Sequence, residues 1–172
     1  MGVQGFAASL GSHAPDAAGH VTHVRVRYAE SDQMGVVYHT HYLVWCEVGR
    51  TDLLRALGRS YSALERDGLR LAVVDAKVRY VAPARYDDLV RVETRVGRVR
   101  SRMITFDYEL SSAEPPIGLL ARASTTLVAL DSEGQPRTLP GELRDALARL
   151  AEGVDALDEG FAGRQAGQQG RS

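Results

Sequence analysis

The side chains best suited to chemistry lie in one loop, between a predicted strand and a long predicted helix. They are Tyr28, Glu30, Asp32, His39 and His41. The segment from His39 to His41 begins the helix, where unpaired backbone N–H groups and the positive end of the helix dipole can polarise a carbonyl oxygen. We select Asp32 from this group, because it follows a strand and lies in a loop completed by Gly35. A carboxylate facing pre-organised amide donors is the minimum arrangement for acyl transfer.

The same residues also have structural explanations. An aspartate at a loop-to-helix junction commonly satisfies the turn, and composition alone favours that role for Asp32. His39 and His41 form an H-x-H pair that could join Asp32 around a metal ion, but no third spaced group of ligands accompanies them. We therefore predict no bound metal and no cofactor.

Composition restricts the classes of function. The 172 residues are 44% hydrophobic and 25% charged, which fits one globular domain. With 21 basic and 22 acidic residues the formal charge is −1, so the chain lacks the basic footprint expected for nucleic acid or an anionic membrane surface. A signal-peptide pattern and an apolar run of membrane-spanning length are both missing, and Cys46 is the single cysteine. We predict a cytoplasmic protein with no nucleic-acid partner and no membrane span.

A long helix must position the loop. Val24, Val26 and Tyr28 alternate with Arg25 and Arg27, which predicts a short strand, and the loop follows this strand. Apolar residues then recur at helical spacing from Tyr42 to Leu57, and further apolar residues on the other faces suggest a helix wrapped on several sides. Gly49, inside this helix, predicts a close approach of the backbone to a sheet.

Further core and surface roles are predicted along the same helix. Tyr42 and Trp45 are expected in the core, and Cys46 is expected to pack there too. Glu47 and Arg50, three residues apart, predict an ion pair at the surface or at a subunit interface.

The remaining sequence predicts a sheet of consecutive strands. Alternating segments cover residues 72–80, 90–96, 104–110 and 119–130, and a basic turn over residues 97–102 joins two of them. A short amphipathic helix follows over residues 140–150. Strands joined by short turns are antiparallel, so we predict an α+β fold in which a curled sheet clasps one long helix. We expect a domain over residues 21–151 and disordered tails over residues 1–20 and 152–172.

The ordered motif resembles a known family. The run Tyr28-x-x-x-Asp32-x-x-Gly35-Val-Val-Tyr38-His39-x-x-Tyr42, followed by Trp45-Cys-Glu47-x-x-Arg50, is similar to the signature of hotdog-fold acyl-CoA thioesterases. The resemblance covers about residues 22–150 and points to the branch that contains the Tol-Pal-associated thioesterase and 4-hydroxybenzoyl-CoA thioesterase. It implies an antiparallel sheet wrapped around one central helix, and hydrolysis of an acyl-CoA to free acid and coenzyme A.

The resemblance also implies the roles of individual residues. Asp32 matches the catalytic carboxylate, as nucleophile or general base, and His39 matches a residue whose backbone N–H contacts the thioester oxygen. Tyr28 matches a tyrosine that assists the site in the Tol-Pal-associated branch, and Gly35 and Tyr38 are expected to bind substrate. The 4-hydroxybenzoyl branch has a tyrosine at the position of His39 and a proline after the aspartate, where this chain has Gln33; both departures favour the Tol-Pal-like branch.

The phosphates of coenzyme A require a local group of cations. The hairpin turn supplies one, and its residues expected to bind substrate are Arg98, Arg100, Ser101 and Arg102. A solvated turn is the alternative. The resemblance further implies a homodimer whose sheets join edge to edge, often doubled to a homotetramer, so the arginines could serve a neighbouring site.

Two other functions fit the same fold. A hydratase or dehydratase would use histidine and a carboxylate as an acid–base pair without cleaving the thioester, and a non-catalytic module would bind acyl-CoA and release no thiol. The order Asp32 then His39 within one loop favours hydrolysis.

Overall fold

The structure, a computed structural model, describes residues 19–151 and contains one antiparallel sheet and several helices. Of the tails expected over residues 1–20 and 152–172, residues 1–18 and 152–172 lie outside the described residues. The elements are β1 (His20–Arg25), the 3-10 helix η1 (Tyr28–Glu30), α1 (His41–Ala56), α2 (Tyr61–Arg66), β2 (Arg70–Tyr80), β3 (Leu89–Val99), β4 (Met103–Ser112) and β5 (Leu119–Leu130). A last helix covers residues 141–151.

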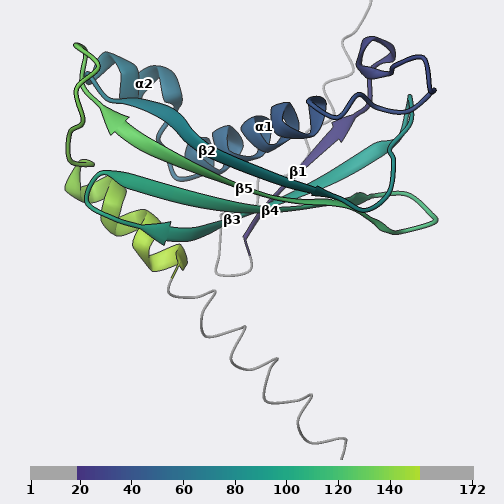
Figure 1. Cartoon of the computed structure of the whole chain (residues 1–172). Coiled ribbons are helices and arrows are strands. Elements are labelled where there is room, and N and C mark those ends of the chain that lie inside the picture. Colours follow the sequence, from purple (N-terminus) through teal and green to yellow (C-terminus); the bar gives the residue numbers. More distant parts are fainter. Residues whose placement is uncertain (1–18, 152–172) are drawn as a thin grey trace, which may run out of the picture.

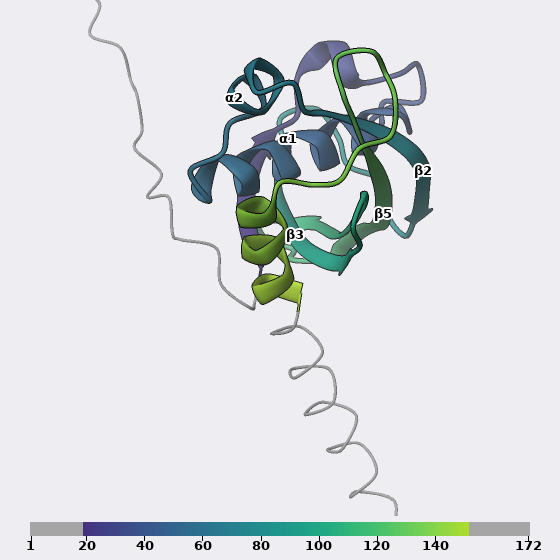
Figure 2. The same cartoon turned by 90° about the vertical axis from the view of Figure 1, so that its left-hand side faces the viewer.

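The sheet curves around α1. Its strands run in the order β1-β3-β4-β5-β2, and every neighbouring pair is antiparallel. Figure 1 shows α1 lying along one face of this sheet, and Figure 2 shows the sheet curling around the helix when the molecule is turned. The predicted α+β architecture, with a sheet wrapped around one long helix, is confirmed.

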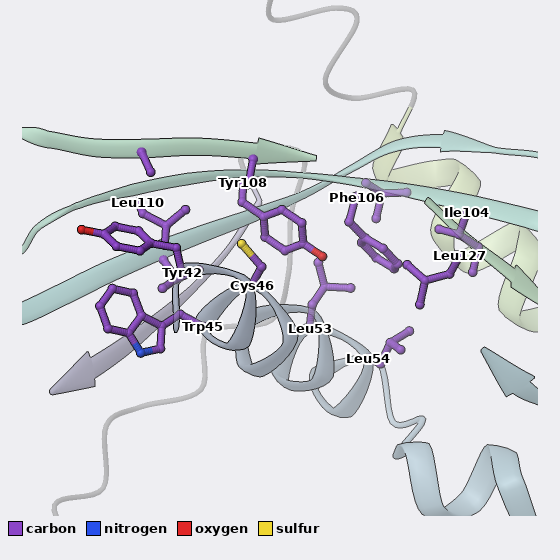
Figure 3. Close-up of a cluster of buried hydrophobic side chains, with 14 of the residues drawn as sticks. Tyr42, Trp45, Cys46, Leu53, Leu54, Ile104, Phe106, Tyr108, Leu110 and Leu127 are labelled. Carbon is purple, nitrogen blue, oxygen red and sulfur yellow. The ribbon is translucent and has the colours of Figure 1, made fainter. Parts of the chain in front are cut away.

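The core forms where α1 meets the middle of the sheet. In Figure 3 the buried face of the helix points at the side chains of β4 and β5. The predicted core positions Tyr42, Trp45 and Cys46 are all at most 2% exposed. Each large apolar side chain buried in this way stabilises the fold by about 1.5–3 kcal/mol. The other residues labelled in this cluster are Leu53, Leu54, Ile104, Phe106, Tyr108, Leu110 and Leu127.

Gly49 is the point where α1 and β3 come closest. A Cβ atom at this position would overlap Thr94 Oγ1 and would lie 3.0 Å from Val92 Cγ1. The predicted close approach is therefore confirmed, and it explains why a residue that weakens a helix stands in the middle of one.

The N-terminal strand differs from its prediction. It covers His20–Arg25, rather than ending at Tyr28, and it begins inside the segment expected to be a tail. Pairing with β3 stops at Arg25, which faces Leu89. The Glu30 carboxylate then accepts a hydrogen bond from the Arg27 backbone N–H at 2.8 Å, and this contact closes η1 instead of extending the strand.

Three further details correct the sequence analysis. Gly97 to Val99 belong to β3 with a register shift after Val96, so only residues 100–102 form the turn. The outer face of α1 is open, since Val44 and Val48 are 45% and 40% exposed. The helix α2 was missed, although Ser60 marks its start and accepts a hydrogen bond from the Ala63 N–H at 3.2 Å.

No helix within residues 19–151 combines the length and the apolar character needed to cross a bilayer.

Candidate active site

Asp32 begins a tight hairpin turn. Its backbone N–H donates to the Val36 carbonyl at 2.9 Å, and its carbonyl accepts from the Gly35 N–H at 3.0 Å. The φ of Gly35 is 71°, a left-handed value that glycine adopts without strain. One carboxylate oxygen of Asp32 accepts from the Met34 N–H at 2.8 Å. Asp32 therefore has the structural role in a turn that its position suggested. Of its two carboxylate oxygens, only Oδ1 accepts a hydrogen bond within residues 19–151.

The same turn occurs a second time, after β5. Asp131 donates to the Gln135 carbonyl at 2.9 Å, accepts from the Gly134 N–H at 3.2 Å, and its carboxylate accepts from the Glu133 N–H at 2.9 Å. Gly134 also has a left-handed φ, of 81°. Asp131 therefore shows what this turn requires of an aspartate when no chemistry is assigned to it.

The start of α1 presents unused backbone donors. Thr40 caps the helix without a side-chain hydrogen bond. Among the hydrogen bonds of the described part of the chain, none uses the backbone N–H of His39 or Thr40 as its donor. Such groups carry the positive end of the helix dipole, so they can stabilise a developing oxyanion.

A pocket of about 280 Å³ opens beside these donors. Its walls come from the loop, the start of α1 and the segment after β2, and its lining residues are Val37, His39, Tyr42, Tyr80, Val81, Ala82 and Pro83. Aromatic rings and aliphatic groups thus surround a backbone that can donate hydrogen bonds, as in many small-molecule sites. The sequence analysis identified His39 but missed Tyr80, whose position at the end of a strand carried no local signal.

The other predicted residues of the loop do not line this pocket. Asp32 is partly buried in its turn, and Gly35 accepts a hydrogen bond from Arg85 Nη1 at 3.3 Å. Tyr38 is 46% exposed, and its ring centroid lies 4.3 Å from that of His39. Tyr28 is 80% exposed and makes only an edge contact among the aromatic pairs of residues 19–151.

Glu30 is the buried carboxylate of the loop. Only 2% of it is exposed, and it accepts hydrogen bonds from the Arg27 backbone and side chain and from Trp45 Nε1 at 3.3 Å. Burial raises its pKa, but the hydrogen bonds from Arg27 and Trp45 and the charge of Arg27 together hold the pKa below its usual value. Glu30 therefore fastens the loop to α1 as an anion, rather than acting as an acid.

This lowered pKa predicts acid sensitivity. A carboxyl group with a lowered pKa stabilises the fold fully above its unfolded pKa, and this contribution is lost as the pH falls through its folded pKa. We expect Glu30→Gln to lower the free energy of unfolding at pH 7 by about 1–3 kcal/mol. The difference from wild type, measured by urea denaturation, should narrow below about pH 4.3.

Glu114→Gln is the matched control for this prediction. Glu114 pairs with Arg25 at the surface, where the two side chains are 52% and 47% exposed, so its replacement should have little effect. An equal loss of stability in both variants at pH 7 would contradict the role given to Glu30.

The predicted cation cluster lies at the far end of the sheet. Tyr80, Ala121, Leu110 and Val92 form one row across neighbouring strands. From Val92 the strand β3 runs on to Val99, directly before the turn, which places the turn roughly 25 Å from this row at about 3.3 Å per residue. Hydrogen bonds from Leu139 and Ala129 to the turn locate it beside the C-terminal helix, opposite the helix entrance in Figure 1. One chain therefore does not bring these arginines to its own pocket.

Cys46 and Arg50, two side chains of α1, are both buried. Burial raises the pKa of the Cys46 thiol to about 12, so it remains protonated and unreactive. The Glu47 and Arg50 pair is present at 3.5 Å, but Arg50 is buried and donates to the Tyr61 hydroxyl at 3.1 Å. No three histidine, cysteine, aspartate or glutamate side chains within residues 19–151 are grouped closely enough to hold a metal ion.

Known proteins are similar to this chain in sequence and in fold. The model of the thioesterase superfamily matches residues 34–118. The chain is 39% identical to YneP of Bacillus subtilis over 64% of this chain and 78% of that protein. It is 36% identical to the acyl-CoA thioester hydrolase YbgC of Escherichia coli over 68% of this chain and 87% of the relative. The solved structure of DHNA-CoA thioesterase from Staphylococcus aureus has a TM-score of 0.70 at 30% identity and covers 82% of this chain and 93% of that one.

Fold, loop motif and relatives together define a hotdog-fold enzyme of the thioester hydrolase class. The chain belongs to the thioesterase superfamily, as the motif from Tyr28 to Arg50 predicted.

Proposed function

We propose that this chain hydrolyses acyl-CoA thioesters to a free acid and coenzyme A. The observation that carries the proposal is the pocket at the start of α1, whose lining includes His39, a residue whose backbone N–H has no acceptor within residues 19–151. Such donors stabilise the tetrahedral oxyanion of acyl transfer. The name of YbgC, which shares 36% identity with this chain, supports acyl-CoA as the substrate.

Asp32 supplies the carboxylate of this mechanism. Its second oxygen attacks the thioester carbonyl, the C–S bond breaks to release coenzyme A as the thiolate, and water then cleaves the mixed anhydride to the free acid and Asp32. In the alternative route, Asp32 removes a proton from a water molecule that attacks the same carbonyl, and the C–S bond breaks to release the thiolate. The N–H of His39 holds the oxyanion, while Tyr28 assists the site and Gly35 and Tyr38 contact substrate. The turn holds Asp32 through Oδ1 and leaves its Oδ2 without a hydrogen bond within residues 19–151, so this oxygen is available for the proposed step.

Release of free thiol tests the proposed function. A panel of short-chain, long-chain and aromatic acyl-CoAs is incubated with the protein, and thiol is measured with a chromogenic disulfide. Hydrolysis predicts equal amounts of thiol and acid from at least one member of the panel. A hydratase would change the acyl group without releasing thiol, and a binding module would do neither; either result would refute the proposal.

We also propose that the protein assembles as a homodimer or homotetramer. The strand β2 stands at the edge of the sheet, with Val73 and Val74 48% and 55% exposed. Val44 and Val48 form the open apolar face of α1. An edge strand and an apolar helix face are both liabilities in a monomer, and a second copy would cover them.

The distant basic turn fits this assembly. We propose that Arg98, Arg100, Ser101 and Arg102 bind the phosphates of a coenzyme A held in the pocket of the partner subunit. Replacing the three arginines by alanine is expected to raise the KM for acyl-CoA at least about tenfold, because charged hydrogen bonds to phosphate are lost. The same variant should hydrolyse an N-acetylcysteamine thioester normally, since that substrate has no phosphate.

Subunit complementation distinguishes a neighbour's site from the subunit's own. The triple-arginine variant is co-expressed with Asp32→Asn under two affinity tags, and the hybrid is purified through both. A hybrid has one complete site only if the arginines act across the interface, so its KM for acyl-CoA should return to the wild-type value. A hybrid that keeps the raised KM would place the arginines and Asp32 in the same subunit's site, or remove the arginines from the reaction.

The branch of the family and the location are further proposals. Tyr28, Gln33 and His39 favour the Tol-Pal-associated branch over the 4-hydroxybenzoyl branch. A cytoplasmic location is supported by the free, buried Cys46, which suits a reducing compartment. Fractionation of cells that express the tagged chain tests the location.

A further inference from the structure

Tyr80 joins the end of β2 to the start of α1. Its hydroxyl group donates a hydrogen bond to the backbone carbonyl of His39 at 2.8 Å. Its ring meets the ring of Tyr42 edge-on, at 5.2 Å between centroids and 85° between planes. It also meets the ring of His39 edge-on at 6.4 Å and lines the pocket. A side chain from a distant strand therefore contacts the peptide at which the helix begins.

The bonded carbonyl belongs to the same peptide group as the Thr40 N–H. A peptide group is planar and trans, so holding its oxygen also fixes the direction of its N–H. A hydrogen bond to the carbonyl polarises the group and strengthens its N–H as a donor. Thr40 has no side-chain cap and its N–H has no acceptor among the described residues, so this donor remains available.

We infer that Tyr80 is a positioning residue for thioester hydrolysis: its hydroxyl holds the His39–Thr40 peptide, so that the Thr40 N–H keeps the direction needed to bind the oxyanion beside the His39 N–H. This inference rests on the proposed function. Tyr80 itself transfers no proton, since its hydroxyl hydrogen is directed at a backbone carbonyl.

The hydroxyl is not needed to hold the segments together. The Ala84 N–H donates to the Tyr42 hydroxyl at 2.9 Å, and the Val37 N–H donates to the Ala84 carbonyl at 2.9 Å. Both bonds join the segment after β2 to the loop and helix without Tyr80. Phenylalanine at position 80 would also keep both ring contacts. Tyr80→Phe therefore removes one hydrogen bond and leaves the packing intact.

Kinetics of Tyr80→Phe test the role in the reaction. We expect kcat to fall about three- to tenfold, which is the range that one hydrogen bond contributes, while KM changes less than about twofold. The pH profile of kcat should keep its shape, because no titrating group of the reaction is removed. Tyr86→Phe is the matched control, since Tyr86 is 57% exposed and its hydroxyl has no hydrogen bond within residues 19–151.

An amide resonance tests the geometry without any turnover. In ¹⁵N-labelled protein the Thr40 amide should shift clearly in Tyr80→Phe and stay in place in Tyr86→Phe, while resonances near the C-terminal end of α1 remain unchanged. A stationary Thr40 resonance would overturn the inference. So would an unchanged kcat, or a kcat profile that loses one pH limb, which would make Tyr80 a proton donor instead.

The two measurements separate this inference from the proposed function. If wild type releases no thiol from any acyl-CoA, the proposed function fails, and the role of Tyr80 fails with it even where the Thr40 resonance shifts. If wild type is active, Asp32→Asn is inactive and Tyr80→Phe retains full kcat, only the role of Tyr80 is overturned.

Discussion

Asp32→Asn is expected to lower turnover of acyl-CoA by about 10³-fold or more, while substrate binding and stability stay close to wild type. Asparagine keeps the oxygen that accepts from the Met34 N–H, so the turn remains. It lacks the anionic oxygen that, in the proposed mechanism, attacks the thioester or takes the proton from water. Turnover is measured by thiol release, binding by calorimetry with an acyl-CoA, and stability by thermal unfolding.

Asp131→Asn is the matched control, because Asp131 occupies the same kind of turn after β5, where its Oδ1 also accepts from the Gln135 N–H. Any loss that comes from weakening such a turn should appear in both variants, whereas a chemical role affects Asp32→Asn alone. Turnover that survives in Asp32→Asn, or falls equally in the two variants, would remove Asp32 from the mechanism.

A single turnover in ¹⁸O-labelled water tests Asp32 as the nucleophile. An anhydride intermediate that water opens at the aspartyl carbon leaves label in the protein, which mass spectrometry of the peptide containing Asp32 detects. General-base catalysis leaves label in the product acid alone, and so does an anhydride that water opens at the acyl carbon, so label in the Asp32 peptide is the decisive result.

Gly49→Ala is expected to destabilise the protein by about 1–3 kcal/mol, although alanine is the better helix former. The added methyl group would overlap Thr94 Oγ1 and press on Val92, both fully buried on β3. α1 would have to move away from the sheet, and the pocket at its start would move with it. The free energy of unfolding from urea denaturation measures the loss, and kcat measures its effect on the site.

Gly141→Ala provides the comparison within the same chain. Gly141 is also helical, but a Cβ atom there meets nothing within 4 Å. Helix propensity alone therefore predicts no loss of stability for this variant. If Gly49→Ala proved as stable as Gly141→Ala, the close approach of α1 to β3 would not limit this position.

The periodic strands and the helix α1 could be predicted from the sequence. The strands over residues 70–80 and 119–130 matched the alternating pattern, and the spacing from Tyr42 to Leu57 predicted α1 nearly to its ends. These patterns are reliable because each reflects one buried face with a fixed period. Gly49 was informative for the same reason, since only tight packing compensates a glycine inside a helix.

Local hydrogen bonding caused the errors near the site. The strand expected up to Tyr28 ends at Arg25, because the Glu30 carboxylate closes a turn around Arg27. An alternating pattern carries no information about that contact. The burial of Glu30 and its hydrogen bond to Trp45 depend on α1, which follows the loop in the sequence, so the local pattern around Glu30 does not show them.

The sequence by itself determined the family motif, which includes Asp32 and the residues at the start of α1, because these residues lie close together along the chain. Only the tertiary structure brought Tyr80 to the carbonyl of His39, across 41 residues, and separated Arg100 from the pocket along β3. The physical reason is that strand register and sheet curvature decide which distant side chains meet, and both arise from the packing of the whole sheet around α1.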